Sequence, residues 1–498
     1  MVPHPETGQA AGMSAWRPEH SYVRAAPKPR YVLYFPLILS AAAVLMWLLP
    51  SDGMLGFGSF VGAGIGFIIL WDFLFRDNLM RLTRISAMGF LLGYSGGTLN
   101  TWLTLPRAGY SLASRAGLLR GELCRGVAAT ILASACLLIV GELFESPILD
   151  VADRLVVTPG LRRVALFGLL VILPVLATGK LQQGGIETSS SGAGGGVVVV
   201  LFGFLVTPTV ILSTIVFLTK DKGKARLFWG AVTVILWLLQ LDLGRRDLVY
   251  SALITVALAR HAGYQWSKLS FRQILVIGLG MSFLFLGFLT YQLVRVASYG
   301  HKNSNLVQQL STVGTWVEEG RAWKIATTST QKNLQGRTFV VAWFSDLLEL
   351  SSTMPTAHGR DFLIQTEEAI PSAFIPNKPK IQEEGIASEQ FDRNYSDQAN
   401  SLLTAGVIDF GLAGVVVYPL VLVFCMSVLV RWLRNFMDRE MYIYGLIIAL
   451  MFTIATEIDL GGFEVGMRNV IIISIGIYLL LRLPSVRLRA EARQGELS

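Results

Sequence analysis

Long apolar segments alternate with short polar segments along almost the whole of this 498-residue chain. An uncharged apolar run of about 20 residues is long enough to cross a bilayer as a helix, and a window of about 19 residues finds about twelve such runs. They lie near 31–49, 54–75, 86–105, 126–144, 162–179, 196–219, 226–243, 247–262, 273–296, 401–431, 441–459 and 469–483. The pattern predicts an all-α polytopic membrane protein.

One long hydrophilic stretch, residues 298–400, interrupts this pattern. Aqueous chemistry has to be concentrated in it or at the helix ends that face it. We expect a large loop of mixed helical and irregular structure, set between nine transmembrane helices in 31–297 and three more in 401–483. Residues 1–30 and 484–498 are expected to be cytoplasmic tails, the first of them flexible.

The composition agrees with a membrane protein, because the chain is 53% hydrophobic and only 15% charged, whereas soluble domains are about a quarter charged. The net charge is +8, and the excess sits in short loops, which indicates membrane orientation rather than a nucleic-acid surface. The three cysteines, Cys124, Cys136 and Cys425, have no CxxC spacing, so neither a metal site nor a disulfide framework is expected.

Basic loops set the orientation. With the N-terminal tail inside, the basic segments 76–84, 220–226, 260–272, 431–440 and 482–493 all fall on the cytoplasmic side. The arginines of 107–125 are the exception. The run GYSGGTLN makes 86–105 the weakest span, and it also fits a re-entrant or broken helix. In the twelve-span threading, the 298–400 loop is extracytoplasmic.

Two adjacent arginines lie in the outer junction LDLGRRD, between apolar runs with almost no loop. A turn this tight keeps Arg245 and Arg246 at the membrane surface, where planar guanidinium groups suit diphosphate oxygens. A snorkelling pair balanced by Asp242 and Asp247 is the alternative. Outer arginines run against the orientation rule, which favours a functional role.

Further candidates lie in and after the polar loop. Arg468 begins the last predicted span and is expected to face an anionic ligand or an acidic partner, Asp459 or Glu464. In the loop, His358 is the residue most suited to accept a proton near neutral pH. The other titratable or anion-binding candidates are Arg360, Asp361, Glu367, Asp392, Arg393 and Asp397.

Familiar soluble motifs are missing from the sequence, including a Walker A loop, HExxH, GxSxG and CxxC. The first outer loop is only SDG and carries no DxD pair. The sequence therefore disfavours ATP-driven and metal-dependent chemistry, and we expect no cofactor.

Four motifs follow one another in the last part of the chain. They are GRR at an outer span junction, a large outer loop ending in IPNKP, the polar DQANS entry into a span and FGLAG at 410–414. With these motifs, the chain over roughly residues 195–483 resembles the bacterial O-antigen and exopolysaccharide polymerase family (Wzy-like), which is related to the O-antigen ligases.

The resemblance implies an inverting glycosyltransferase of the bacterial inner membrane that polymerises undecaprenyl-diphosphate-linked repeat units at the periplasmic face without metal or nucleotide sugar. Its partners would be lipid-linked glycan donor and acceptor, membrane lipids, and chain-length regulator and flippase proteins. Arg245 and Arg246 would bind diphosphate, with Arg360, Arg393 or Arg468 closing the site. A loop residue would activate the acceptor hydroxyl, and the candidates are Asp397, His358 and Glu367, in that order.

One departure bears on the choice between polymerase and ligase. Ligases carry a His-Asn pair about ten residues before the Gly-x-x-Gly element, and alignment on Gly411 and Gly414 puts Asn400 and Ser401 there. This favours the polymerase. Ligase-type transfer, a transporter or flippase of lipid-linked glycans, and a structural membrane protein remain alternatives. A transporter should show charges buried at mid-membrane in several spans, whereas here the charges gather at one face.

Overall fold

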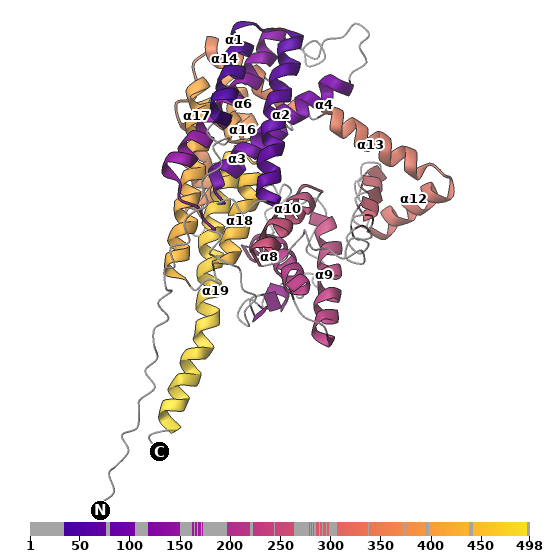
Figure 1. Ribbon diagram of the computed structural model, residues 1–498, viewed down its shortest axis with the longest axis vertical. Coiled ribbons are helices and arrows are strands. Elements are labelled where there is room, and N and C mark those ends of the chain that lie inside the picture. The colour runs from indigo at the N-terminus through magenta and orange to yellow at the C-terminus, as the bar shows by residue number, and fades with distance from the viewer. Residues whose placement is uncertain are drawn as a thin grey trace, which may run out of the picture.

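The described part of this computed structural model is a bundle of helices with an arm that projects from one side (Figure 1). The structure describes residues 34–75, 80–104, 118–149, 197–219, 223–262, 306–371, 374–393, 398–437 and 442–495, apart from 244, 337 and 380. It also describes scattered residues within 162–172 and 278–297. Within these residues every regular element is a helix.

The N-terminal half contributes α1 (Tyr34–Leu48), α2 (Asp52–Phe75), α3 (Leu82–Phe90), η2 (Leu91–Gly96), α4 (Gly97–Thr104), α6 (Arg120–Phe144), α8 (Val197–Thr219), α9 (Lys224–Leu243) and α10 (Arg245–His261). The C-terminal half contributes α12 (Leu306–Glu318), α13 (Ala322–Gly336), α14 (Thr338–Thr353), α15 (Arg360–Ala369), α16 (Glu383–Phe391), α17 (Leu402–Phe436), α18 (Ile443–Ile454) and α19 (Leu460–Gly495). Helices α12 and α13 form the projecting arm (Figure 1).

Four helices in the described residues are long and apolar enough to cross a membrane: Asp52–Phe75, Gly121–Phe144, Leu402–Phe436 and Leu460–Leu479. Their outer faces carry exposed aromatic and aliphatic side chains, among them Phe60 and Trp71 on α2 and Val421 on α17. A face this apolar is stable against lipid rather than water. The protein is therefore membrane-embedded, while the expected total of about twelve spans stays a prediction.

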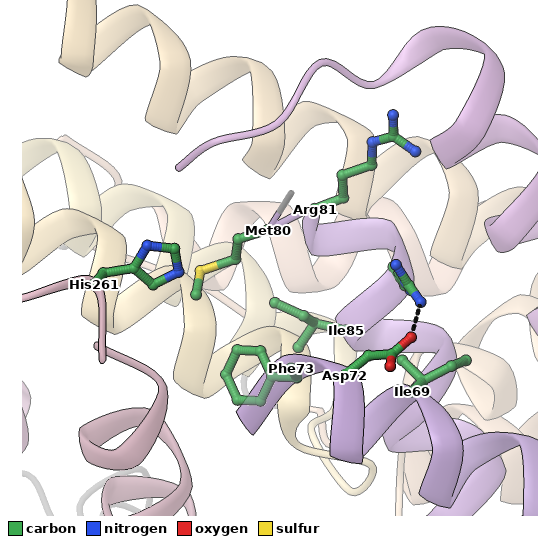
Figure 2. A pocket seen from close by; sticks show the side chains of 8 residues that line it. Ile69, Asp72, Phe73, Met80, Arg81, Ile85 and His261 are labelled. Atoms are coloured by element: carbon green, nitrogen blue, oxygen red, sulfur yellow. Dashed lines mark hydrogen bonds and ion pairs between the residues drawn. The ribbon is translucent and has the colours of Figure 1, made fainter. Parts of the chain in front are cut away.

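Segments expected on the cytoplasmic side meet at one end of the bundle. The Arg84 guanidinium of α3 lies 2.8 Å from the Asp72 carboxylate of α2, and Arg434 of α17 donates to the Ile148 carbonyl at 3.0 Å. His261, the last residue of α10, faces the same pocket as Asp72 (Figure 2). These contacts bring ends of α2, α3, α10 and α17 together, while the twelve-span threading and its orientation stay predictions.

Three helices depart from the predicted spans. The weak span 86–105 is helical but contains the π-helix η2 between α3 and α4. The predicted span 441–459 is helical only over α18, about 18 Å at 1.5 Å per residue. The last helix begins at Leu460 rather than 469, because the Asp459 carboxylate accepts from the Gly462 N–H at 2.7 Å and caps it.

The helix α17 is not the continuous span that 401–431 predicts. Its backbone leaves helical geometry at Phe410 and Gly411, the latter with φ 59° and ψ −142°. A methyl group built on Gly414 would overlap the Gly406 carbonyl oxygen, so the two halves fold tightly against each other. The half before the break is fully buried.

The polar stretch 298–400 is more than a surface loop. Its helix α14 packs against α6 and α17 and buries Val341, Phe344 and Leu347. The Phe344 ring lies 5.7 Å from that of Tyr94 in η2. The run FSDLLELSS counts as polar by composition, yet its apolar residues share one helical face.

Candidate functional site

The helix α15 occupies the centre of the site, packed against α17 and α19. Its N-terminal end has an acidic cap supplied by another helix. The Asp409 carboxylate, at the break in α17, accepts from the Asp361 and Phe362 N–H groups at 3.0 Å each. The Tyr418 hydroxyl donates to the same carboxylate. Unpaired N–H groups at a helix start favour an anion, so Asp409 fixes the position of α15.

A left-handed bend leads into α15. His358 has φ 52° and Gly359 has φ 90°. The Ala357 and His358 N–H groups donate to the Ile408 and Asp409 carbonyls at 2.8 and 2.9 Å. Those carbonyls lose their helical partners at the break in α17, so the bend satisfies them.

Two cations gather at the C-terminal end of α15. The Arg468 guanidinium donates to the Ala369 carbonyl through Nη1 and to Asn469 Oδ1 through Nε at 3.1 Å. The Lys378 ammonium donates to the Glu368 carbonyl at 2.8 Å and to the Ile370 carbonyl. Partial burial and the nearby Arg468 charge lower the Lys378 pKa, against a raising effect of Glu368. Cations at this end complement the helix dipole.

Glu464 lies one helical turn before Arg468 on α19. Its Oε1 accepts from the Thr366 hydroxyl of α15 at 2.9 Å, and the residue is only 7% exposed. Thr366 and Ala369 are also one turn apart, so α15 and α19 meet through these two contacts. A carboxyl and a guanidinium therefore lie about 6 Å apart along α19 and contact the same helix.

Further buried carboxyl groups surround the first turn of α15. Asp361 is fully buried, and its Oδ1 accepts from Gln365 at 3.2 Å. Burial, then the neighbouring Asp409 charge, raise the Asp361 pKa to about 8. Burial and Asp361 likewise raise the pKa of Glu383 in α16 well above its ordinary value, although the Thr404 hydroxyl bound to it acts in the opposite direction.

Three of these carboxyl groups have one oxygen with no hydrogen-bond partner: Oδ2 of Asp361, Oε2 of Glu383 and Oε2 of Glu464. A buried ionised oxygen without a partner is costly, so such a group favours its protonated form or an incoming donor. In the described ranges no three His, Cys, Asp or Glu side chains are grouped as a metal site would require.

The structure brings several of the sequence-predicted residues to α15. His358 and Arg360 lie at its start, Glu367 is on it, and Arg468 binds its end. Arg360 forms an ion pair with Glu389 of α16 at 2.7 Å, and both side chains are about half exposed. Arg360 and Ala369 are about 13 Å apart along the helix, so Arg360 and Arg468 approach opposite ends of α15. His358 and Glu367 are exposed.

Other predicted residues lie away from this helix or outside the described residues. Arg393 is exposed after the end of α16. Arg245 and Arg246 form the first turn of α10, one residue after α9 ends, as the tight junction predicts. Their side chains and the whole of Asp397 lie outside the described residues. Their roles stay predictions.

Sequence reasoning missed Lys378, Asp409 and Tyr418, and treated Glu464 only as an ion-pair partner for Arg468. Asp409 carried a usable signal, since an acidic residue inside an apolar segment is costly without a role. Lys378 belongs to the quoted IPNKP segment. The relation of Glu464 to Arg468 follows from i, i+4 spacing only once α19 is known to begin at Leu460.

Comparison of the chain with protein-family models, with curated proteins and with solved structures finds no match.

Proposed function

We propose that this protein is an integral-membrane glycosyltransferase that polymerises undecaprenyl-diphosphate-linked repeat units at the outer face of a bacterial inner membrane. The observation that carries the proposal is the pair Glu464 and Arg468, one turn apart on α19 and both in contact with α15. A proton acceptor beside a fixed cation is the minimum that transfer from a diphosphate requires.

The reaction is an in-line displacement at the anomeric carbon of the donor sugar. The acceptor hydroxyl oxygen forms the new glycosidic bond and inverts the configuration. The bond from the anomeric carbon to the diphosphate oxygen breaks, and its electron pair leaves with the diphosphate. The acceptor proton passes to a carboxylate, for which Glu464 is the best-placed candidate because its Oε2 has no other partner.

Cations compensate the charge that develops on the leaving diphosphate. Arg468 and Lys378 are adjacent at the end of α15. Arg245 and Arg246 begin α10, and a helix N-terminus adds its own unpaired N–H groups to an anion site. The Arg468 guanidinium, held in a partly buried setting, would stabilise the leaving group without a metal ion.

The test is incubation of the purified protein in nanodiscs with lipid-linked repeat units, without ATP and with a chelator present. A ladder of products is the expected result. The Arg468→Ala variant should leave single repeats, while Arg393→Ala, the loss of an exposed arginine, should keep the ladder. Failure of the wild-type protein to extend any lipid-linked repeat would refute the proposal, and transfer only to an acceptor without diphosphate would assign a ligase.

A further inference from the structure

In the described conformation, α15 blocks the groups that a diphosphate substrate needs. Arg468 is bound to the Ala369 carbonyl, and Lys378 to the carbonyls of Glu368 and Ile370. Glu464 is bound to Thr366 of the same helix. Movement of α15 would release these contacts from all three groups.

The segments that flank α15 would allow this helix to move as a unit. It begins after the bend at His358 and Gly359, and it ends before the segment 371–379, which contains three prolines. One face carries the buried Asp361, Gln365 and Ala369, whereas Phe362, Leu363 and Glu367 on other faces are exposed. A short helix held on one side, preceded by a left-handed bend and followed by a proline-containing segment, is typical of a lid.

Acidic groups converge on Asp361, the most deeply buried residue of this face, from every neighbouring element. Asp409 and Tyr418 face it from α17, Asp459 and Glu464 from the start of α19, and Glu383 from α16. The nearby cations do not neutralise it, because Arg360 pairs with Glu389, and Arg468 and Lys378 bind the opposite end of α15. His358 lies exposed beyond the bend.

Asp361 and Glu383 lack a cationic partner among the described residues, and each has one oxygen without a hydrogen bond. Two buried carboxylates side by side would repel each other and Asp409. The packed arrangement is therefore stable only when these carboxyl groups keep their protons.

We propose that α15 is a pH-dependent lid, closed over Glu464, Arg468 and Lys378 by protonated Asp361 and Glu383, and released when these two groups lose their protons. The lid goes beyond the proposed function, since it concerns the movement of α15 and needs no substrate.

The direction follows from the difference between closed and open states. Burial raises the Asp361 pKa to about 8 in the closed state, whereas a solvated aspartate ionises near about 4. The closed state is most favoured below the lower of these values. The equilibrium constant for closing falls as pH rises, because the carboxyl groups lose their protons at lower pH in the open state than in the closed state. Each group contributes a fall of about tenfold per pH unit.

Hydrogen exchange of the full-length protein in nanodiscs, followed by mass spectrometry from pH 6 to pH 8.5, measures the opening. Labelling times are scaled so that intrinsic amide exchange is constant. The expected result is a protection factor for 360–369 that falls at least about tenfold per pH unit between pH 6 and 8, while peptides of α6 stay constant.

Two variants separate a lid from general loosening. Asp361→Asn mimics the protonated side chain and removes one of the two titrating groups. It should therefore keep α15 better protected than in the wild-type protein at pH 8 and reduce the slope of the profile, and Glu383→Gln should do the same if the first variant does not fold. Glu367→Gln, at an exposed position of α15, should retain the wild-type profile. A constant wild-type protection factor, or a wild-type slope in both Asp361→Asn and Glu383→Gln, would overturn the lid whatever the enzymatic activity.

Discussion

Gly406 and Gly414 pack back to back across the break in α17, so closely that a side chain on either would overlap the backbone of the other. The break between them needs Gly411, whose φ of 59° and ψ of −142° lie in a region accessible almost only to glycine. The two glycines of FGLAG therefore allow the chain to fold back on itself at this point. The fold-back also leaves Asp409 at a helix end, free to cap α15.

Replacing Gly414 with alanine should destabilise the protein by about 2 kcal/mol or more, because the new methyl group has to displace backbone rather than a side chain. Thermal unfolding in detergent measures the effect. The matched control is Gly64→Ala in α2, where nothing lies within 4 Å of the added carbon. Equal melting temperatures for the two variants would contradict the tight contact.

Removal of the Asp409 carboxylate should release α15 from the bundle. Asp409→Ala leaves two helix N–H groups and the Tyr418 hydroxyl without their acceptor, a cost of about 3 kcal/mol in a buried position. Limited proteolysis should then cut within 354–371. Tyr418→Phe loses one of the three donors and serves as control. Resistance of Asp409→Ala equal to that of the wild-type protein would show that the cap is dispensable.

The acceptor base can be identified by parallel substitutions. Glu464→Gln should reduce the rate of chain extension by about 10²- to 10⁴-fold with little change in substrate binding, since it removes the proposed proton acceptor and keeps the shape of the side chain. His358→Gln and Glu367→Gln change exposed side chains that are not the proposed proton acceptor. Their rates of chain extension should stay within about twofold of the wild-type rate. If Glu464→Gln keeps full rate while His358→Gln, Glu367→Gln or Asp397→Asn loses it, the base is the residue that the sequence alone suggested.

Two ion pairs of almost equal length should differ sharply in their effect on stability. Arg84 and Asp72 lie 2.8 Å apart with 10% and 1% of their side chains exposed, whereas Arg360 and Glu389 lie 2.7 Å apart with 46% and 53% exposed. Asp72→Ala should cost about 3–5 kcal/mol, because it leaves a buried guanidinium without this partner. Glu389→Ala should cost at most about 1 kcal/mol. Similar melting temperatures for the two variants would contradict the burial of the inner pair.

The apolar periodicity was sufficient to predict an all-helical membrane protein and the tight α9–α10 junction at Arg245. It could not predict the break in α17, because Val407 and Leu412 on either side are as apolar as a continuous span requires. The apolar pattern also could not distinguish α14 from the rest of the polar loop. Asp346 and Glu349 make the composition of this segment polar, although its apolar residues share one face of the helix.

The candidate site was predictable only in part. Arg468 attracted attention as a charge at a span boundary, but its contacts depend on where α19 begins, and Asp459 sets that through its cap. The relation of Asp409 to Asp361 joins segments 48 residues apart. Contacts of this kind arise from tertiary folding and leave no local pattern in one sequence.

The short length of α18 bears on how a substrate would arrive. At about 18 Å it covers little more than half of a hydrocarbon layer of about 30 Å. In the predicted threading α18 begins at the inner headgroups, so the chain after it, including Thr456, whose hydroxyl donates to the Gly89 carbonyl, would lie below the plane of the outer headgroups. On the proposed function, a glycolipid would then reach Glu464 and Arg468 by diffusing sideways within its own leaflet, with its isoprenoid tail still in lipid. Bilayer thickness would then set how far the lipid-linked substrate lies from these two residues.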